Sequence, residues 1–189
     1  HEARGRYPEG PQRDDALTRL HEELGLIRYH GLSGFFLLHR DILEIAREVA
    51  LEVRPEGSAR RALPPGRGRG SSVGSIVCYL TGLSHIDPVA SGLFLGRFLN
   101  RDIRSVPDID LDCPRDVRAR LIEEVVRRYG SEHAALVAAF RRNDINGDRS
   151  PRVNNTQRPL VFVPSAKHRK PSVSPQRFWR LVGIGQPGA

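Results

Sequence analysis

Apolar residues recur through much of the chain at the three- and four-residue spacing of helices that bury one face. In the first such stretch the apolar positions end at Leu24, and Gly25 is expected to stop the helix. In the last stretch Gly130 follows the final apolar turn in the same way. The spacing predicts packing helices over 14–24, 41–52 and 114–129.

Two other stretches have the pattern of β-strands. Residues 105–112 end in an alternation of aspartate and aliphatic side chains, which indicates a strand with an acidic edge and an apolar face. Residues 35–38 form a brief apolar run, and we predict a short buried strand there. Helices that alternate with short strands indicate an α+β fold.

The acidic edge of the predicted strand comprises Asp108, Asp110 and Asp112, whereas Ile109 and Leu111 face a core. Carboxylates this close repel one another and raise the pKa of at least one of them, unless a cation or solvent relieves the charge. Magnesium prefers hard oxygen ligands and is commonly held by one or two carboxylates together with substrate phosphates. The pattern therefore predicts a magnesium site.

Two simpler interpretations compete with a metal site. A calcium loop of the EF-hand type begins with the same acidic alternation, but it needs glycine and glutamate where this chain has Cys113 and Ala119. The other interpretation is a solvated strand face followed by a helix cap, with Asp112 as the N-cap before Pro114. That cap leaves the first two aspartates as the stronger metal candidates.

A glycine-rich turn at 66–75 leads into the apolar segment 76–80, a predicted helix, and has the composition of an anion cradle. Glycines let the backbone approach a phosphate, the helix offers N–H groups at its amino end, and Arg69 and Ser71 add side-chain donors. A flexible linker would have the same composition. The turn lacks the lysine of a Walker A loop and the spacing of a dinucleotide site. Together with the acidic strand it favours metal-assisted nucleotidyl transfer.

These motifs, in this order and spacing, resemble the C-family bacterial DNA polymerases, which comprise the alpha subunit of the replicative polymerase III holoenzyme and its error-prone relatives. The similarity covers most of the chain. It implies a partial palm domain related to the polymerase-beta-like nucleotidyltransferases. The segments that carry the resemblance are 25–27, 34–37, 68–75, 87–88, 97–100 and 107–110.

The resemblance also implies roles for individual residues. Gly70 and Ser71 would contact the incoming triphosphate, and Arg97 would neutralise its charge. Asp108 and Asp110 match the family's first two catalytic aspartates, which hold two magnesium ions for in-line transfer of a deoxynucleotide to a primer 3′-hydroxyl. The implied partners are a DNA primer-template, deoxynucleoside triphosphates and the other subunits of the full-length polymerase.

The chain also departs from the family. The third catalytic aspartate, the thumb, the fingers and the clamp-binding region have no counterpart in the sequence. Methionine is absent and His1 comes first, so we expect an internal fragment that is inactive or weak alone. Cys78 and its neighbours look more like the error-prone branch, although a small core residue is the simpler interpretation of that cysteine. A non-catalytic remnant and a small stand-alone nucleotidyltransferase remain the alternatives.

Charge divides the chain near residue 140. Residues 141–189 carry ten Lys and Arg against two Asp, and their net charge of +8 equals that of the whole chain. We therefore expect a partial palm domain over 1–140 and a disordered or aberrant tail over 141–189. The tail has two interpretations, a frameshifted or misjoined gene end and a basic arm that binds nucleic acid.

Cysteine and histidine placement adds little further chemistry. Cys78 and Cys113 lack the spacing of a metal site, and no signal peptide or membrane-length apolar run is present, so a reducing, cytoplasmic location is expected. The histidines have no ligand spacing and are expected to be surface or locally hydrogen-bonded residues. Those considered are His21, His30, His39, His85 and His133.

Overall fold

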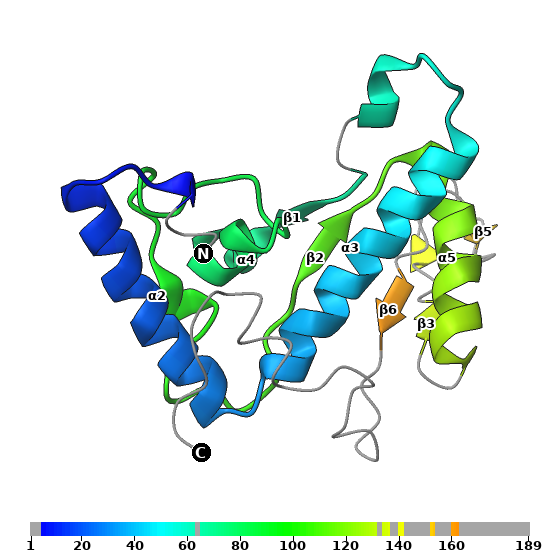
Figure 1. Cartoon of the computed structure of the whole chain (residues 1–189). Helices are drawn as coiled ribbons and strands as arrows, with labels where there is room; N and C mark the ends of the chain where they lie inside the picture. Colours follow the sequence, from blue (N-terminus) through cyan, green and yellow to red (C-terminus); the bar gives the residue numbers. More distant parts are fainter. Residues whose placement is uncertain are drawn as a thin grey trace.

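The structure is a computed structural model that describes residues 5–62, 65–131, 134–136, 140–141, 152–153 and 160–162. Three long helices and a two-stranded antiparallel sheet make up its main body (Figure 1). Helix and strand together confirm the predicted α+β class. Within the described residues, no helix is both long enough and apolar enough to cross a membrane.

The first two helices are longer than their sequence patterns predict. Helix α2 spans Pro11–Tyr29 and continues through Gly25, which was expected to end it. Helix α3 spans Ser33–Val53, so the strand predicted at 35–38 is wrong and those residues form its first turns. Gly25 is exposed on α2, and the tertiary packing of the helix outweighs the cost of about 1 kcal/mol that an interior glycine carries.

Helix α3 runs between two hydrophobic clusters and belongs to both. Its first half buries Phe36 and Leu37 in a cluster that also includes residues of α2 and of the short helix α4 (Ile76–Leu80). Helix α4 was predicted from the sequence. Its second half buries Ile45 and Val49 against α5. The helix thus connects the glycine-rich region to the C-terminal helix.

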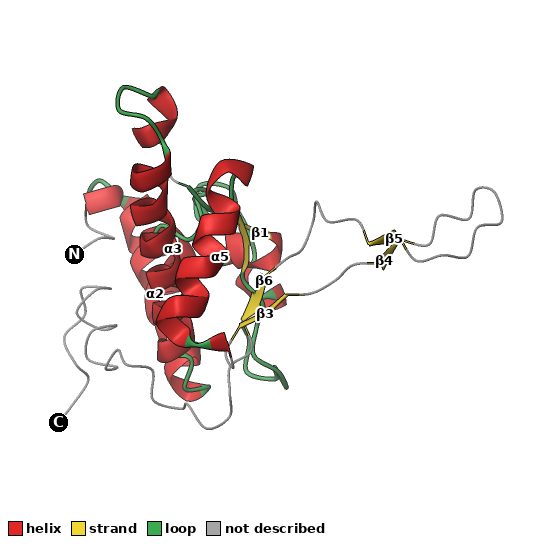
Figure 2. Cartoon of the chain, turned by 90° about the vertical axis from the view of Figure 1, so that its right-hand side faces the viewer, coloured by secondary structure: helices red, strands yellow, loops and turns green. Residues whose placement is uncertain are grey.

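Helix α5 spans Arg115–Tyr129, as its spacing predicts, and Gly130 follows with a φ of 87°. Its apolar face packs against α3. Viewed from the side of α5, Figure 2 shows this helix in front of α3. Polar contacts also join the pair: among them, Arg54 Nε donates to Asp116 Oδ2 at 2.9 Å, and the Tyr129 hydroxyl donates to Asp41.

The sheet pairs β1 (Arg67–Arg69) with β2 (Asp110–Asp112). The 3-10 helix η1 (Ala59–Ala62) and β1 come before Gly70–Gly74, the second part of the glycine-rich turn. The backbone N–H of Gly68 also donates to the carbonyl of Leu83 at 2.7 Å, which ties β1 to the segment after α4. A Cβ on Gly68 would lie 2.3 Å from that carbonyl oxygen, so only glycine fits there.

Four further short strands pair beyond α5. Strand β3 (Ala134–Leu136) pairs with β6 (Leu160–Phe162), and β4 (Phe140–Arg141) pairs with β5 (Arg152–Val153). Most of 141–189, where a tail was predicted, lies outside the described residues, as does His133.

Candidate nucleotide and metal site

The acidic stretch has the alternating burial that its sequence predicts. Asp108, Asp110 and Asp112 are exposed, whereas Ile109 is only 6% exposed. Leu111 is half-buried against the main core, which is the hydrophobic cluster that includes Phe36 and Leu37. Asp112 does not cap α5, because Pro114 holds the N-cap position. The three carboxylates therefore share the solvent side of β2 and the residues just before it.

Pairing of the strands brings the glycine-rich turn beside these acids. Arg69 lies opposite Asp110 in the ladder, and the turn begins at the next residue, Gly70, with the 3-10 helix η2 (Gly70–Gly74). Gly70 has a φ of 71°, and a Cβ placed on it would lie 3.4 Å from Asp110 Oδ2. Two segments about forty positions apart in the sequence thus meet at one end of the sheet, as the predicted site requires.

The side chains of the turn divide into exposed and anchored ones. Ser71 is exposed, whereas Ser72 is buried and its hydroxyl donates to the Arg69 carbonyl at 2.8 Å. The guanidinium of Arg69 lies 3.1 Å from Asp112 Oδ1, and both side chains are more than 60% exposed. An exposed pair contributes about 1 kcal/mol or less, so Arg69 is available to an incoming anion at little cost.

The amino end of α4 is occupied by side chains of the protein itself. Ser75 is the N-cap, and its Oγ accepts a hydrogen bond from the Cys78 amide at 2.9 Å. The fully buried carboxylate of Glu23 accepts from the Ser75 hydroxyl and, at 2.9 Å, from the Ile76 amide. The prediction that this helix end offers free N–H groups to a phosphate is therefore wrong, because the Glu23 carboxylate accepts from the Ile76 amide and the Ser75 hydroxyl accepts from the Cys78 amide.

The end of the turn is held from α2 and from the segment before Arg97. Arg19 Nη2 donates to the Gly74 carbonyl at 2.6 Å and Nη1 to that of Pro88 at 3.3 Å. On the other side, a Cβ on Gly74 would lie 2.7 Å from the Phe94 carbonyl oxygen. The backbone of Gly74 is thus held by a side chain of α2 and packs closely against the segment before η3.

Arg97 ends the 3-10 helix η3 (Leu95–Arg97), which packs against η2. The Arg97 side chain is exposed, and the next two residues, Phe98 and Leu99, are buried in the main core. Asn100 Nδ2 donates to the Gly96 carbonyl at 2.8 Å and closes this turn. The buried and hydrogen-bonded neighbours therefore hold the backbone at Arg97, while its side chain faces solvent. This segment contacts the glycine-rich turn.

His39 belongs to the surroundings of the acids, which the sequence did not indicate. Its Nδ1 lies 2.8 Å from the Phe35 carbonyl, as expected of a locally bonded histidine. Burial lowers the pKa of His39, against the hydrogen bond to Phe35 and the charge of Asp108, which raise it. The His39 ring thus lies close enough to Asp108 for the charge of that carboxylate to act on the pKa of the ring.

Asp108 and Asp110 fit a divalent metal as part of a ligand set. Within residues 5–62 and 65–131, no hydrogen bond or ion pair engages either carboxylate, so their oxygens face solvent. No group of three or more His, Cys, Asp or Glu able to hold a metal exists among the residues that the structure describes. Carboxylate oxygens that face solvent are of the kind that a divalent cation such as Mg2+ prefers as ligands.

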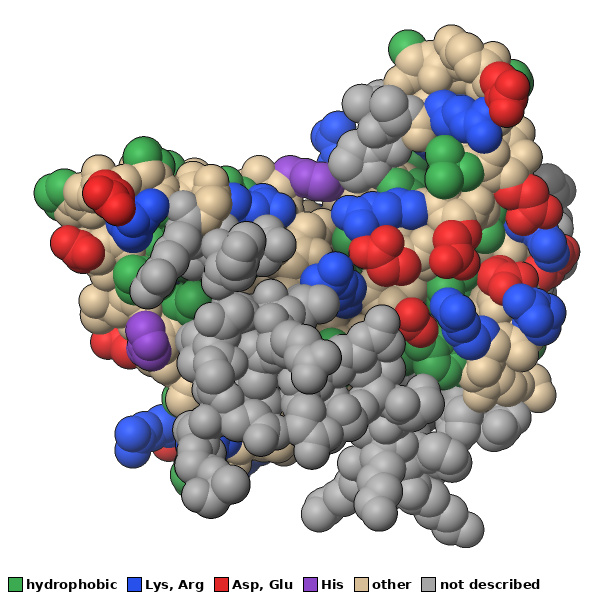
Figure 3. All heavy atoms as spheres, viewed as in Figure 1, with side chains coloured by type: hydrophobic (Ala, Val, Ile, Leu, Met, Phe, Trp, Pro, Cys, Tyr) green, Lys and Arg blue, Asp and Glu red, His purple; other side chains and the backbone are tan. Residues whose placement is uncertain are grey.

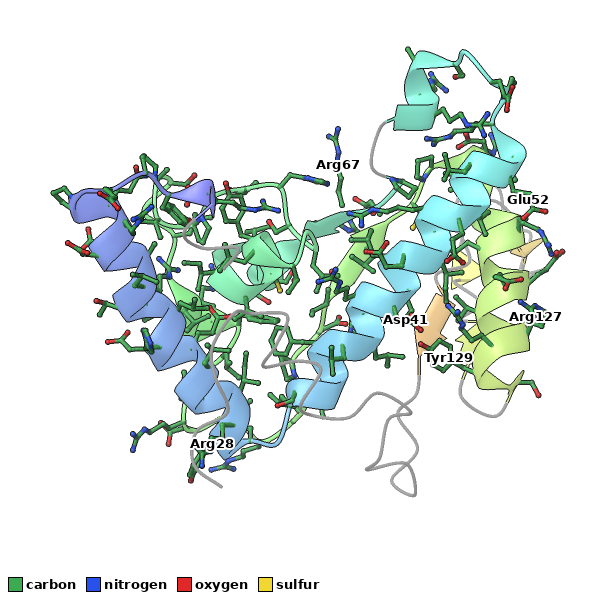
Figure 4. All side chains as sticks on the ribbon, viewed as in Figure 1. Arg28, Asp41, Glu52, Arg67, Arg127 and Tyr129 are labelled. Carbon is green, nitrogen blue, oxygen red and sulfur yellow. The ribbon has the colours of Figure 1, made fainter. Side chains whose placement is uncertain are left out.

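Away from the site, ion pairs join charged side chains of α3 and α5. Figure 3 shows acidic and basic side chains side by side over α3 and α5. They include Arg47–Glu44 on α3 and Arg120–Glu52 between the two helices. In Figure 4, Asp41 and Tyr129 lie together between α3 and α5, whereas Arg67 points away from the body of the molecule. Arg67 thus adds an outward-pointing cation to β1, the strand next to the acids.

Comparison with known proteins gives one consistent family. The model of a family described as the bacterial DNA polymerase III alpha NTPase domain matches residues 1–145. An error-prone DNA polymerase of Bdellovibrio bacteriovorus is 38% identical over 135 residues, which are 71% of this chain and 11% of the relative. The DNA polymerase III alpha subunit of Campylobacter jejuni is 32% identical over 139 residues, 74% of this chain and 11% of the relative. That of Aquifex aeolicus is 35% identical over 122 residues, 65% and 10% respectively. The chain thus spans about a tenth of the length of these curated relatives.

Proposed function

Because the chain belongs to the family of the bacterial DNA polymerase III alpha NTPase domain, we propose that it is part of the palm of a DNA-directed DNA polymerase. In this role it supplies the nucleotide-binding turn and two of the metal-binding carboxylates. The observation that carries the proposal is the β1–β2 pairing, which brings Gly70 against Asp110. A triphosphate held at the turn would place its reacting phosphorus beside the acids.

The turn supplies groups of the kind that bind a triphosphate. Gly70 leaves the backbone open to close approach, and Ser71 adds an exposed hydroxyl next to it. Arg69 and Arg97 add positive charge from the strand before the turn and from the segment packed on it. Neither guanidinium is buried, so each can turn toward the phosphates without breaking contacts of the core.

Asp108 and Asp110 would hold Mg2+ on the solvent side of β2. Bound magnesium ions would neutralise phosphate charge and favour ionisation of the primer 3′-hydroxyl. The residues of this chain orient the triphosphate and keep two carboxylates in register with it. A third carboxylate would come from another part of the full-length polymerase, so we expect the chain alone to bind nucleotide but to extend a primer poorly. The substrates of the whole enzyme would be a DNA primer-template and deoxynucleoside triphosphates.

The proposal is tested by titrating the chain with dTTP in the presence and absence of Mg2+ by calorimetry. We expect magnesium-dependent binding that is lost when Asp108→Asn and Asp110→Asn are combined. Asp102→Asn is a control for loss of negative charge near the site, because it neutralises one exposed carboxylate in the preceding loop. Equal binding by the double variant and the wild type, or no binding by a folded wild type, would contradict the proposal.

A further inference from the structure

Glu23 is a fully buried acid on the apolar face of α2, between Leu20 and Leu24. A carboxylate in such a place is costly unless it is well hydrogen-bonded. Both of its oxygens accept hydrogen bonds, Oε1 from the Ser75 hydroxyl and Oε2 from the Ile76 amide. The acid is therefore committed to the point where the glycine-rich turn passes into α4.

Helix α2 holds this point from two successive turns. Arg19, four residues before Glu23, donates to the carbonyl of Gly74. Three consecutive residues, 74 to 76, are thus bound by two side chains of one helix. The backbone of Gly74 also packs closely against the segment before η3, because a Cβ there would lie 2.7 Å from the Phe94 carbonyl oxygen.

We propose that Glu23 is a positioning residue for the nucleotide-binding turn and acts through Ser75 and the Ile76 amide. The inference rests on the proposed function and deepens it, because it assigns a task to a residue that touches neither nucleotide nor metal. The 3-10 helix of the turn is five residues long, so its far end at Gly74–Ser75 sets where Gly70 and Ser71 lie. Loss of the grip would let the exposed end shift relative to Asp110.

The two oxygens of Glu23 act as acceptors in a way that an amide cannot repeat. Glu23→Gln keeps the volume of the side chain but leaves only one oxygen to accept from Ser75 and Ile76. Ser75→Ala removes the hydroxyl and leaves the contact from Glu23 to the amide. The two variants therefore interrupt the same connection at different atoms.

The test measures dTTP binding with Mg2+ by the full chain for wild type, Glu23→Gln, Ser75→Ala and both together. Circular dichroism first establishes which variants fold. We expect each folded single variant to bind about tenfold more weakly, with the double variant no worse than about the weaker single one. Glu22→Gln on the exposed side of α2 and Ser84→Ala, another buried serine whose hydroxyl accepts an amide, are controls expected to bind as wild type.

The outcomes separate the inference from the function it rests on. If the wild type binds no dTTP, both fall. If the wild type binds dTTP, and folded Glu23→Gln and Ser75→Ala bind it as tightly as the wild type does, only the positioning role is contradicted. Glu23 then merely stabilises the fold. Should Glu23→Gln fail to fold, the affinity of Ser75→Ala decides. Amide hydrogen exchange at 70–74 gives a second readout, which the inference requires to be faster in the binding-deficient variants.

Discussion

Gly70 faces Asp110 so closely that a Cβ on the glycine would touch the carboxylate, 3.4 Å from Oδ2. The backbone of Gly70 is also in the left-handed region, with a φ of 71°. We expect Gly70→Ala to lower the free energy of unfolding by about 1–2 kcal/mol, because an L side chain is strained there. Urea denaturation measures this change.

The matched control is Gly25→Ala, at a glycine inside α2 with open space around it. Here the added methyl group should raise the free energy of unfolding by up to about 1 kcal/mol, because alanine is the better helix former. If both substitutions changed stability in the same direction, the conformational argument for Gly70 would be wrong.

Arg54 joins the end of α3 to the start of α5 from a buried position. Its side chain is 6% exposed and donates to Asp116 and to the Arg60 carbonyl. We expect Arg54→Met to lower the free energy of unfolding by about 1–3 kcal/mol, because the carbonyl loses its donor and the carboxylate its partner. The pair between the exposed Arg127 and Glu124, within α5, is the control, and Arg127→Met should leave the free energy of unfolding nearly unchanged.

The same contact predicts a dependence on acid. The hydrogen bond from Arg54 lowers the pKa of Asp116 below its ordinary value of 3.8. A carboxyl group whose pKa is lower in the folded chain stabilises that chain above the unfolded pKa, and the contribution disappears as the pH falls through the folded value. The difference in stability between wild type and Arg54→Met should therefore shrink as the solution is made acidic below that range, and only the part due to the Arg60 carbonyl should remain. A difference that does not change with pH would contradict the assignment.

For Glu23 we expect the opposite dependence of stability on pH. Burial raises its pKa to about 7 from 4.5, against the hydrogen bonds from Ser75 and Ile76, which lower it. The folded chain then takes up a proton before the unfolded chain does, so stability increases as the pH falls from about 7 to 4.5. Relative to Glu23→Gln, wild type should gain roughly 3 kcal/mol over this interval. Parallel pH profiles of the two proteins would show that Glu23 does not titrate there.

Cys78 should be chemically inert in the folded chain. It is fully buried, and burial raises its pKa far above the ordinary thiol value. Cys113 is half-buried, and burial raises its pKa as well. We expect an excess of a thiol reagent to label Cys113 slowly and Cys78 only when urea unfolds the chain. Fast labelling of Cys78 in the native protein, located by mass spectrometry, would contradict the packing around α4.

The acidic alternation, α4 and α5 could be read from the sequence because each pattern is local and complete. The bounds of α2 and α3 could not. The glycine in α2 is a stop signal that tertiary packing overrides, and an apolar run as short as 35–38 fits a strand or a helix equally well until the rest of α3 is known. Both errors came from judging a short segment without its neighbours.

The pairing of the two halves of the site was predicted only as a need of the chemistry. Its cause, the ladder that sets Arg69 opposite Asp110, joins distant segments and has no local sequence signal. Glu23 was missed for a different reason, since it was counted as part of an ordinary amphipathic helix. A signal did exist, because an acid at position 23 falls between Leu20 and Leu24 on the face that must be buried.

The pleat of β2 limits how this region can change its length during evolution. Alternating side chains point to opposite faces, so a single-residue insertion or deletion that slipped β2 by one position would turn Ile109 and Leu111 to solvent and drive the aspartates into the core. A slip of two positions would keep the faces but move Asp110 about 7 Å along the strand, away from Gly70. Insertions and deletions near β2 should therefore be tolerated only where they preserve its register.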